Sequence, residues 1–343
     1  MKALVMREYR TFEYCDVPTP VPGKDQVLVR VKACAVCGSD VHGSDGSTGR
    51  RQPPVIMGHE AAGIIEKVGS DVTAWKPGDR VTFDSTIYCG QCERCQKGLV
   101  NLCAHRRVLG VSCDEYRQDG AFAEFVVVPQ HILYQLPDKV SFTQAAMVEP
   151  LAIAMHAATR VPVRQGAAVL VVGVGTIGML TLQVLRSMGA GTLIAVDVDQ
   201  TKLDEARANG ATHVLNSNDP DVRTHILNAT EQQGVDVAFD AVGIGDTVNL
   251  CIDSVALNGA VVLVGNLKPA ISFPLQKVVT RQLSLFGSCA SAGEYAACLD
   301  LIASGQVDTD RMISKTVPLK EGGEWINRVY EGQPGLNKIV LIP

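Results

Sequence analysis

The stretch AAVLVVGVGTIG, residues 167–178, decides the fold of this chain. Its first six residues are small or apolar, as in a buried parallel strand. The next six contain Gly173, Gly175 and Gly178 in the spacing G-x-G-x-x-G, and the apolar segment 179–186 predicts a helix. Such glycines let a pyrophosphate approach backbone N–H groups at a helix start, where the helix dipole favours negative charge. Strand, glycine loop and helix together predict a dinucleotide-binding Rossmann domain.

The next strand indicates which dinucleotide binds. This strand, 192–196, ends at Asp197, about 20 residues after the glycine loop, where a carboxylate can accept hydrogen bonds from both ribose hydroxyls of the adenosine half. A 2′-phosphate would be repelled by Asp197 and Asp199, and no arginine flanks Asp197. We therefore expect NAD as the cofactor. Lys202 is a candidate to cover the ribose or adenine, and equally a candidate for a solvated helix residue.

Strand and helix patterns continue to alternate beyond Lys202. Four further strand-like runs lie at 213–215, 235–240, 259–265 and 283–287. Six strands alternating with helices predict an α/β fold with a doubly wound parallel sheet. The carboxyl ends of the strands should face the dinucleotide, which adds Val242, Val264 and Gly265 to the candidate cofactor residues.

The first 150 residues have a different pattern, with short β-rich runs separated by proline and glycine. The runs 26–32, 63–68 and 79–83 are examples, and they predict a β-barrel-like domain. At 343 residues the chain suits two domains. A helix predicted over 293–304 leads to the apolar run 338–343, which should return to the first domain. We therefore place the first domain at 1–150, completed by 291–343, and the Rossmann domain at 151–290.

The tripeptide Gly58-His59-Glu60 lies between an apolar run and a run of small residues. A buried histidine beside a buried glutamate is unfavourable unless something pairs them. Zinc is the most economical partner, because it accepts both imidazole nitrogen and carboxylate oxygen. Cys37 can supply a third ligand, and Glu149 is a candidate for the fourth.

Four cysteines lie close together in the first domain, at Cys89, Cys92, Cys95 and Cys103. Four thiolates in one loop match a closed tetrahedral zinc site, in which the ion holds together a lobe with few apolar side chains of its own. Because protein ligands occupy all four positions, we expect this zinc to be structural.

Composition excludes several classes of function. With 31 basic and 36 acidic side chains the net charge is −5, so nothing draws the chain to nucleic acid or to anionic membranes. No stretch of about 18 apolar residues exists, and the first residues are too soon interrupted by charge for a signal peptide. An odd count of 11 cysteines argues against a disulfide scaffold. We expect a cytoplasmic protein that acts on a small molecule.

These motifs resemble those of the zinc-dependent medium-chain dehydrogenases. The motifs are, in chain order, residues 37–42 (CGSDVH), Gly58-His59-Glu60, the four-cysteine loop, Glu149-Pro150-Leu151 and the glycine loop 173–178. Glu60 and Glu149 replace the second-cysteine pattern of simple alcohol dehydrogenases, so the chain is most similar to the polyol branch. The resemblance implies a GroES-like catalytic domain, a Rossmann domain and an active-site cleft between them.

The resemblance also assigns roles to residues. It implies that Cys37, His59 and Glu60 hold a catalytic zinc, with Glu149 as a fourth ligand or as the partner of the zinc-bound water. Ser39 and His42 match positions that relay the hydroxyl proton to solvent, and Ile177, Asp197 and Lys202 match cofactor contacts. The implied reaction is hydride transfer from a secondary hydroxyl of a polyol, a sugar alcohol or its phosphate, to NAD.

The substrate itself stays open at this point. Where sorbitol dehydrogenases carry an Arg-Tyr pair past the last Rossmann strand, this chain has Ala290-Ser291. Threonine and butanediol dehydrogenases of the same family are alternatives, and a non-catalytic NAD-binding zinc protein is a further one. Zinc-free quinone or enoyl reductases lack such ligands and fit poorly. In the polar loop 43–51, Arg50 or Arg51 is a candidate phosphate contact.

One segment suggests self-association. Residues 269–274 carry Ile271 and Phe273 at the end of the predicted sheet, where an open edge would otherwise invite aggregation. We expect a homodimer or homotetramer in which this segment pairs with its copy across a twofold axis.

Overall fold

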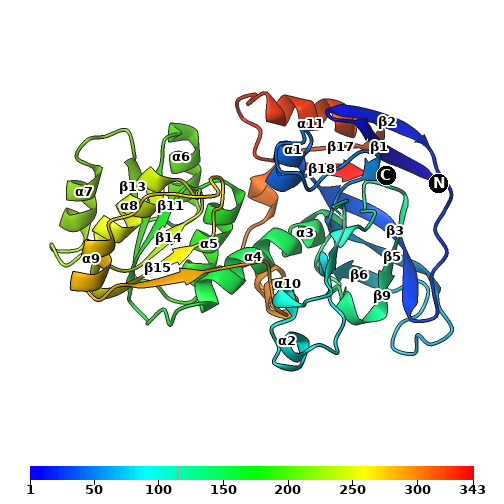
Figure 1. The fold of residues 1–343 in the computed structure, drawn as a ribbon, viewed down its shortest axis with the longest axis horizontal. Coiled ribbons are helices and arrows are strands. Elements are labelled where there is room, and N and C mark those ends of the chain that lie inside the picture. The colour runs from blue at the N-terminus through cyan, green and yellow to red at the C-terminus, as the bar shows by residue number, and fades with distance from the viewer. Residues whose placement is uncertain (114–115) are drawn as a thin grey trace. The chain divides into compact units, whose positions relative to one another are not determined.

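A computed structural model describes residues 1–113 and 116–343 of the chain. The chain divides into two compact units (Figure 1). The barrel unit comprises Met1–Glu149 and Ala292–Pro343, and the Rossmann unit comprises Pro150–Ser291. None of the helices in the described ranges is both long and apolar enough to cross a membrane.

The barrel unit is built from three sheets. A seven-stranded sheet has the order β10-β6-β5-β3-β18-β17 with β9 also paired to β3, a three-stranded sheet has the order β2-β1-β4, and β7 pairs with β8. The strands are β1 (Lys2–Glu8), β2 (Thr11–Asp16), β3 (Gln26–Ala35), β4 (Val55–Ile56), β5 (Glu60–Val68), β6 (Arg80–Phe83), β7 (Thr86–Ile87), β8 (Arg107–Val108), β9 (Phe125–Pro129), β10 (Leu133–Gln135), β17 (Ile313–Pro318) and β18 (Lys338–Ile342). The helices are α1 (Gly38–Gly43), α2 (Glu93–Gln96), α3 (Phe142–Ala146), α10 (Tyr295–Ala303) and α11 (Gly322–Tyr330).

The last strand of the chain pairs within the barrel unit. β18 lies between β3, to which it is antiparallel, and β17, to which it is parallel (Figure 1). Its residues Ile339, Val340 and Leu341 are buried in the unit. A strand with a neighbour on each edge and buried apolar side chains is an integral part of the barrel unit.

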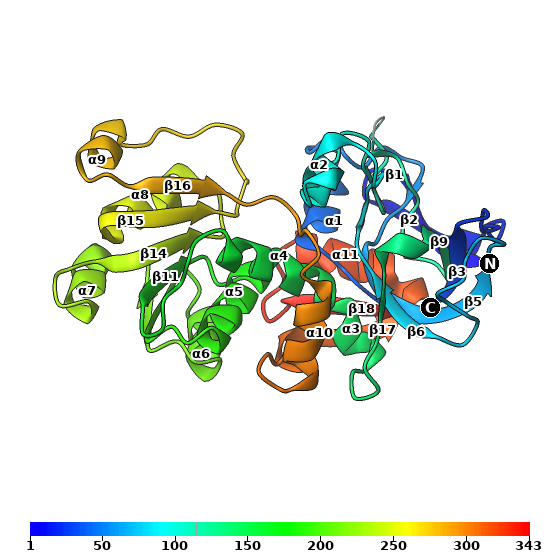
Figure 2. The ribbon, with the colours of Figure 1, turned by 90° about the horizontal axis from the view of Figure 1, so that it is seen from below.

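The Rossmann unit contains a parallel sheet of six strands in the order β13-β12-β11-β14-β15-β16. Figure 2 shows β11, β14, β15 and β16 in this order. This is the strand order of dinucleotide-binding Rossmann folds, which confirms the predicted α/β class. The strands are β11 (Ala168–Val172), β12 (Thr192–Asp197), β13 (His213–Asn216), β14 (Val235–Asp240), β15 (Val255–Leu263) and β16 (Ser284–Gly287). The helices are α4 (Val148–Thr159), which begins in the barrel unit, α5 (Thr176–Ser187), α6 (Gln200–Ala208), α7 (Val222–Ala229), α8 (Gly245–Ser254) and α9 (Leu275–Thr280).

Two predicted elements have different bounds in the structure. The strand predicted over 259–265 spans Val255–Leu263, because the N–H groups of Val264 and Gly265 both turn to the carbonyl of Asp240 instead of continuing the ladder. The helix predicted from Gly293 begins at Tyr295. Gly293 has a φ of +103°, which a helix cannot contain.

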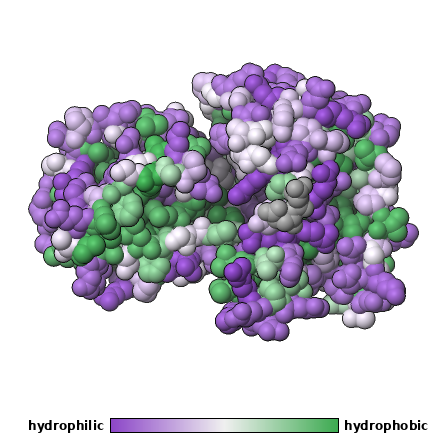
Figure 3. Space-filling view, in the orientation of Figure 1, coloured by the Kyte–Doolittle hydropathy of each residue, from purple (hydrophilic) through white to green (hydrophobic). Residues whose placement is uncertain are grey.

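Apolar side chains are exposed at one edge of the Rossmann unit. Figure 3 shows hydrophobic residues gathered in the region that Figure 1 labels β15 and α9. Leu267, Phe273, Leu275 and Val279 are between 43% and 67% exposed there. The predicted pairing segment 269–274 belongs to no strand, and β16 forms one of the two edges of the sheet.

Candidate active site

Cys37, His59 and Glu60 meet in the barrel unit. Cys37 is the N-cap residue of α1, directly after β3, and Glu60 is the first residue of β5. β3 and β5 pair antiparallel with Ala35 opposite Glu60, which brings Cys37 to His59 and Glu60. One ligand atom from each of the three lies within 4.8 Å of the other two.

A glycine makes this approach possible. Gly58 has a φ of +93°, and a Cβ atom there would clash with the Phe122 ring and lie 2.9 Å from Cys34 Sγ. Since L-residues rarely adopt this backbone conformation, glycine is required for both conformation and space. The chain can therefore turn sharply from β4 into β5 and present His59 toward Cys37.

The three donors fit a catalytic zinc ion. Thiolate, imidazole and carboxylate are all zinc ligands, and three protein ligands with one replaceable position are typical of catalytic sites. His59 and Glu60 are 6% and 1% exposed, so their polar atoms have little access to solvent. The Nδ1 atom of His59 faces Asp40 Oδ1 at 3.5 Å, which leaves the other ring nitrogen available for a metal.

Asp40 and Arg51 lie directly behind these ligands. The Arg51 guanidinium donates to Asp40 Oδ1 at 2.9 Å and to Ser39 Oγ at 3.1 Å. Burial alone would raise the pKa of Asp40, but His59 and Arg51 hold it well below its usual range. Arg51 is 3% exposed and is therefore not a solvated loop residue, whereas Arg50 is exposed, and a phosphate contact at either arginine stays a prediction.

Glu60 has a partner that sequence reasoning missed. Lys338, the first residue of β18, places Nζ 2.7 and 2.9 Å from the two carboxylate oxygens of Glu60. The same Nζ donates to the Val36 carbonyl at 3.1 Å, and Lys338 is 2% exposed. A lysine that begins an otherwise apolar terminal strand was the available signal in the sequence.

Glu149 lies in the first turn of α4 and is 7% exposed. Ser85 Oγ donates to its Oε1 atom at 2.8 Å. Burial raises the pKa of Glu149, while the nearby His59 opposes this rise. Glu149 is not one of the three clustered donors, so its place as a fourth ligand or as a partner of bound water stays a prediction.

The predicted relay residues both lie on α1. Ser39 is exposed, and its hydroxyl donates to Cys37 Sγ at 3.3 Å. His42 is also exposed and follows one turn later on the same helix, where i and i+3 side chains share a face. The structure therefore brings Ser39 to Cys37 and leaves both Ser39 and His42 accessible to solvent.

The four-cysteine group also assembles. The sulfur atoms of Cys89, Cys92, Cys95 and Cys103 lie within 4.8 Å of one another, and no disulfide joins them. Backbone N–H groups point at these sulfurs and lower the pKa of Cys92 to about 6, which favours the thiolate that zinc binds. This loop has few apolar residues, so the group fits a closed structural zinc site.

The glycine loop forms the start of the dinucleotide site. A side chain at Gly178 would collide with the carbonyl of Gly173, and one at Gly173 would collide with Val242. Gly175 caps α5 and a Cβ atom there would meet nothing, which leaves its surface open to a phosphate. Ile177 lies in the first turn of the same helix.

Asp197 lies at the carboxyl end of β12, as predicted. Its carboxylate accepts hydrogen bonds from Val174 N at 2.8 Å and from Asp199 N at 3.0 Å, so it also fixes the glycine loop. Lys202 follows on α6. Val264 and Gly265 follow β15 beside Val242, and a Cβ atom at Gly265 would collide with the Val242 backbone.

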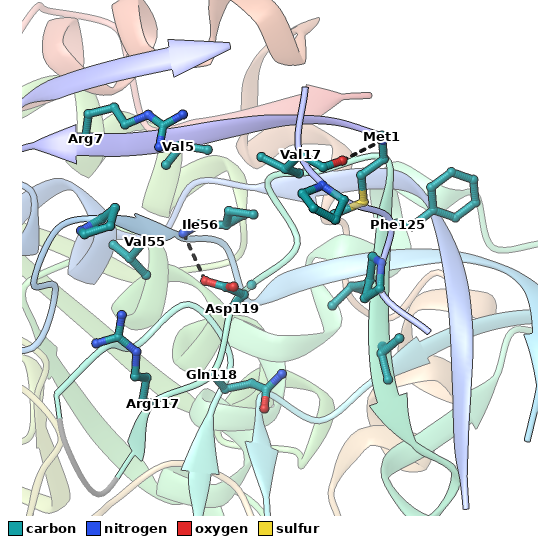
Figure 4. A pocket seen from close by; sticks show the side chains of 16 residues that line it. Met1, Val5, Arg7, Val17, Val55, Ile56, Arg117, Gln118, Asp119 and Phe125 are labelled. Carbon is teal, nitrogen blue, oxygen red and sulfur yellow. Dashed lines mark hydrogen bonds between the residues drawn. The ribbon is translucent and has the colours of Figure 1, made fainter. Parts of the chain in front are cut away.

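A separate cavity of about 610 Å³ lies elsewhere in the barrel unit (Figure 4). Apolar residues of β1, β4 and β9 line it together with Arg7, Arg117 and Asp119, whose carboxylate accepts a hydrogen bond from Ile56 N. None of the candidate ligands, relay residues or cofactor residues lines this cavity. It is not part of the candidate active site.

Comparison with protein families and with known proteins agrees with this site. Residues 23–138 match the model of the alcohol dehydrogenase GroES-like domain, and residues 176–304 match that of the zinc-binding dehydrogenases. Sorbitol dehydrogenase of Bacillus subtilis is 32% identical over all of this chain and 97% of its own length.

Two solved structures are similar along the whole chain. Galactitol-1-phosphate dehydrogenase of Escherichia coli has a TM-score of 0.92 at 25% identity, with 100% of both chains covered. A Sinorhizobium meliloti protein described as a zinc-binding dehydrogenase, bound to NADP, has a TM-score of 0.91 at 33% identity, with 100% of this chain and 99% of that one covered. The metal donors, the Rossmann topology and these matches together show that the chain belongs to the zinc-dependent medium-chain dehydrogenase family, in its polyol dehydrogenase-like branch.

Proposed function

We propose that this chain oxidises a secondary hydroxyl of a polyol, a sugar alcohol or its phosphate, to a carbonyl with NAD as cofactor. The observation that carries the proposal is the group Cys37, His59 and Glu60, whose ligand atoms lie within 4.8 Å of one another. When bound, zinc acts as a Lewis acid that lowers the pKa of the substrate hydroxyl, and NAD accepts the hydride.

The residues of the chain then divide the remaining tasks. Ser39, whose hydroxyl touches Cys37 Sγ, accepts the substrate proton, and His42 passes it toward solvent. Arg51 and Asp40 hold Ser39 and His59 in place. The glycine loop and Asp197 bind and orient the dinucleotide, with Ile177, Lys202, Val242, Val264 and Gly265 as further contacts.

The carboxylates favour a polyhydroxylated substrate over a simple alcohol. Both carboxylate oxygens of Glu60 accept hydrogen bonds from Lys338, whereas only one oxygen of Glu149 accepts a hydrogen bond, from Ser85. The second oxygen of Glu149 is therefore the more available acceptor for a substrate hydroxyl. An apolar alcohol would leave that acceptor unpaired at a cost of about 1–3 kcal/mol, or about 5- to 150-fold in specificity. The sorbitol and galactitol-1-phosphate dehydrogenases that the chain resembles support this choice.

Steady-state kinetics test the proposal. We expect kcat/KM with NAD to be higher for sorbitol, galactitol or their phosphates than for ethanol. Butane-2,3-diol and threonine belong in the same series, and the Ser39→Ala variant serves as the control that retains the metal donors. A preference for threonine or ethanol would refute the polyol assignment, and no NADH from any substrate would favour a non-catalytic protein.

We also propose a cytoplasmic location and a homo-oligomer. Reduced thiols of the kind that zinc requires at the four-cysteine loop persist in a reducing compartment, which supports the location. The exposed apolar side chains near α9 support the oligomer.

A further inference from the structure

Lys338 is held in one place by the backbone around it. β18 pairs with β3 through Val340 opposite Ala35 and Leu341 opposite Cys34, and Val36 N donates to the Ile339 carbonyl. Three acceptors, the two oxygens of Glu60 and the carbonyl of Val36, surround Nζ at 2.7 to 3.1 Å. An ammonium group has three protons, so every donor of Lys338 has a partner.

This ion pair is unlike the other lysine pairs of the described chain. In the pairs of Lys2, Lys97 and Lys277, the lysine side chain is between 42% and 63% exposed. Lys338 and Glu60 have side chains that are 2% and 1% exposed. Because charges taken out of water are costly, each of the two depends strongly on the other.

We infer that Lys338 competes with the catalytic zinc for Glu60 and so sets how tightly the barrel unit retains that ion. This inference rests on the assignment of Glu60 as a zinc ligand in the proposed function. Both oxygens that Glu60 could offer to a metal already accept hydrogen bonds from Lys338. Lys338 is a positioning residue, since it acts through Glu60.

Charge determines the direction of the effect. Cys37 as thiolate and Glu60 as carboxylate supply two negative charges, which balance a zinc dication. Lys338 adds a positive charge that repels the ion and draws electron density from its carboxylate ligand. Without Lys338, zinc is the one remaining cation that contacts Glu60, so we expect the ion to leave more slowly.

The metal-free protein should respond in the opposite way. There, removal of Lys338 leaves Glu60 buried without a cation, and an uncompensated buried charge destabilises the fold. Zinc should therefore raise the melting temperature of a Lys338→Met variant by more than it raises that of the wild type. A salt bridge that served the fold alone would instead lower both melting temperatures equally and leave zinc release unchanged.

The experiment measures zinc release from the zinc-loaded protein into an excess of a chromogenic chelator, without substrate. The variants are Lys338→Met, Lys338→Gln and Lys338→Arg. Lys277→Met is the matched control, because it removes a lysine that pairs with Asp253 in the Rossmann unit. Melting temperatures are recorded for the zinc-loaded and the zinc-depleted forms of each protein.

Zinc should leave the three-donor site of Cys37, His59 and Glu60 before it leaves the closed four-cysteine site, so release should have a faster and a slower phase. We expect Lys338→Met to slow the faster phase by about tenfold. Lys338→Arg keeps the charge and should resemble the wild type, as should Lys277→Met. If Lys338→Met does not fold, Lys338→Gln carries the test, since its amide can still donate to Glu60 without a charge. Unchanged or faster release from the neutral variants would overturn the inference.

A double substitution separates this inference from the proposed function. In a Glu60→Gln background, Lys338→Met should no longer slow zinc release, because the carboxylate for which the two cations compete is absent. An effect of equal size in both backgrounds would overturn the competition. Failure of the polyol assay would leave this result intact, and failure of the zinc result would leave the polyol assay intact.

Discussion

At the residue scale, Asp197 holds the glycine loop, and we predict that it also binds the ribose of the dinucleotide. Its carboxylate accepts hydrogen bonds from Val174 N and Asp199 N. The negative charges of Asp197 and Asp199 oppose a 2′-phosphate, so NAD should be preferred. The NADP bound to the Sinorhizobium meliloti relative shows that the family fold also admits the phosphate.

Two variants remove the charge of Asp197 and its hydrogen bonds in steps. We expect Asp197→Asn to reduce the preference for NAD by loss of the charge and of one hydrogen bond, because its single amide oxygen can accept from Val174 N or from Asp199 N but not from both. Asp197→Ala should reduce the preference further and raise KM for both cofactors, since the loop also loses its acceptor. The ratio of kcat/KM for NAD to that for NADP checks this. A wild-type ratio below one would contradict it.

Asp84 gives a prediction about pH. Its side chain is 1% exposed, and burial raises its pKa to about 7, aided by Glu149 and Glu294 and opposed by the Thr86 N–H. Burial, and after it the charge of Asp84, raises the pKa of Tyr88, Tyr134 and Tyr295. A carboxyl whose pKa is raised by folding stabilises the fold below its unfolded pKa, and this contribution is lost as pH rises toward about 7.

We therefore expect Asp84→Asn to be more stable than the wild type above pH 7, by up to about 4 kcal/mol. The difference should shrink as pH falls from 7 toward the ordinary aspartate pKa of 3.8, and it should level off only below that value, where Asp84 becomes protonated in the unfolded state as well. Asparagine keeps an oxygen acceptor for Thr86 N, so the comparison isolates the charge. Urea unfolding of both proteins at several pH values measures the difference. A difference that does not change with pH would show that Asp84 does not titrate in this range.

At the scale of elements, the turn from β4 into β5 positions the metal donors. Gly58 and Gly78 have nearly equal φ values, +93° and +96°, but a Cβ atom at Gly58 would strike Phe122 while one at Gly78 would meet nothing. Gly78→Ala should therefore cost only the backbone strain, about 1–2 kcal/mol. Gly58→Ala should cost more and displace His59.

Zinc content distinguishes the two glycine variants. The wild type should hold two zinc ions per chain, of which brief chelation removes the one at the three-donor site first. We expect Gly58→Ala to lose this labile ion and to keep the ion of the four-cysteine loop, while Gly78→Ala keeps both. Elemental analysis before and after chelation provides the measurement. Two retained ions in Gly58→Ala would mean that the turn does not position His59.

Features formed by residues close together in the sequence could be predicted, whereas contacts between distant residues could not. The glycine loop, the four-cysteine loop and the strand runs are local patterns, and the structure contains all of them. Arg51 and Lys338 were missed as buried partners, because their burial results from pairing with Asp40 and Glu60 rather than from local sequence. The bounds of β15 and α10 likewise depend on hydrogen bonds and backbone angles that residue type alone does not determine.

At the scale of the whole molecule, the order of the strand and helix patterns along the chain predicted the fold of each unit. Six alternating strands predicted the Rossmann sheet, and the apolar terminal run predicted a return to the barrel. The same strand brings Lys338 to Glu60, the contact on which the inferred competition with zinc depends. A residue about 280 positions away in the chain can be placed there only by the complete fold.

The edge of the Rossmann sheet leads to the last prediction. Phe273, Leu275 and Val279 are 43%, 63% and 67% exposed near β16, the edge strand. An exposed edge with apolar neighbours is an aggregation hazard unless another chain covers it, so we expect a homodimer or homotetramer. Light scattering should give a mass of at least twice 36.6 kDa.

Phe273→Asp should shift the protein toward the monomer, because a buried carboxylate at the interface would lack a partner. Leu99→Asp is the matched control, since Leu99 is 42% exposed in the four-cysteine loop, and it should leave the mass unchanged. A wild-type mass near that of one chain at working concentrations would refute the oligomer.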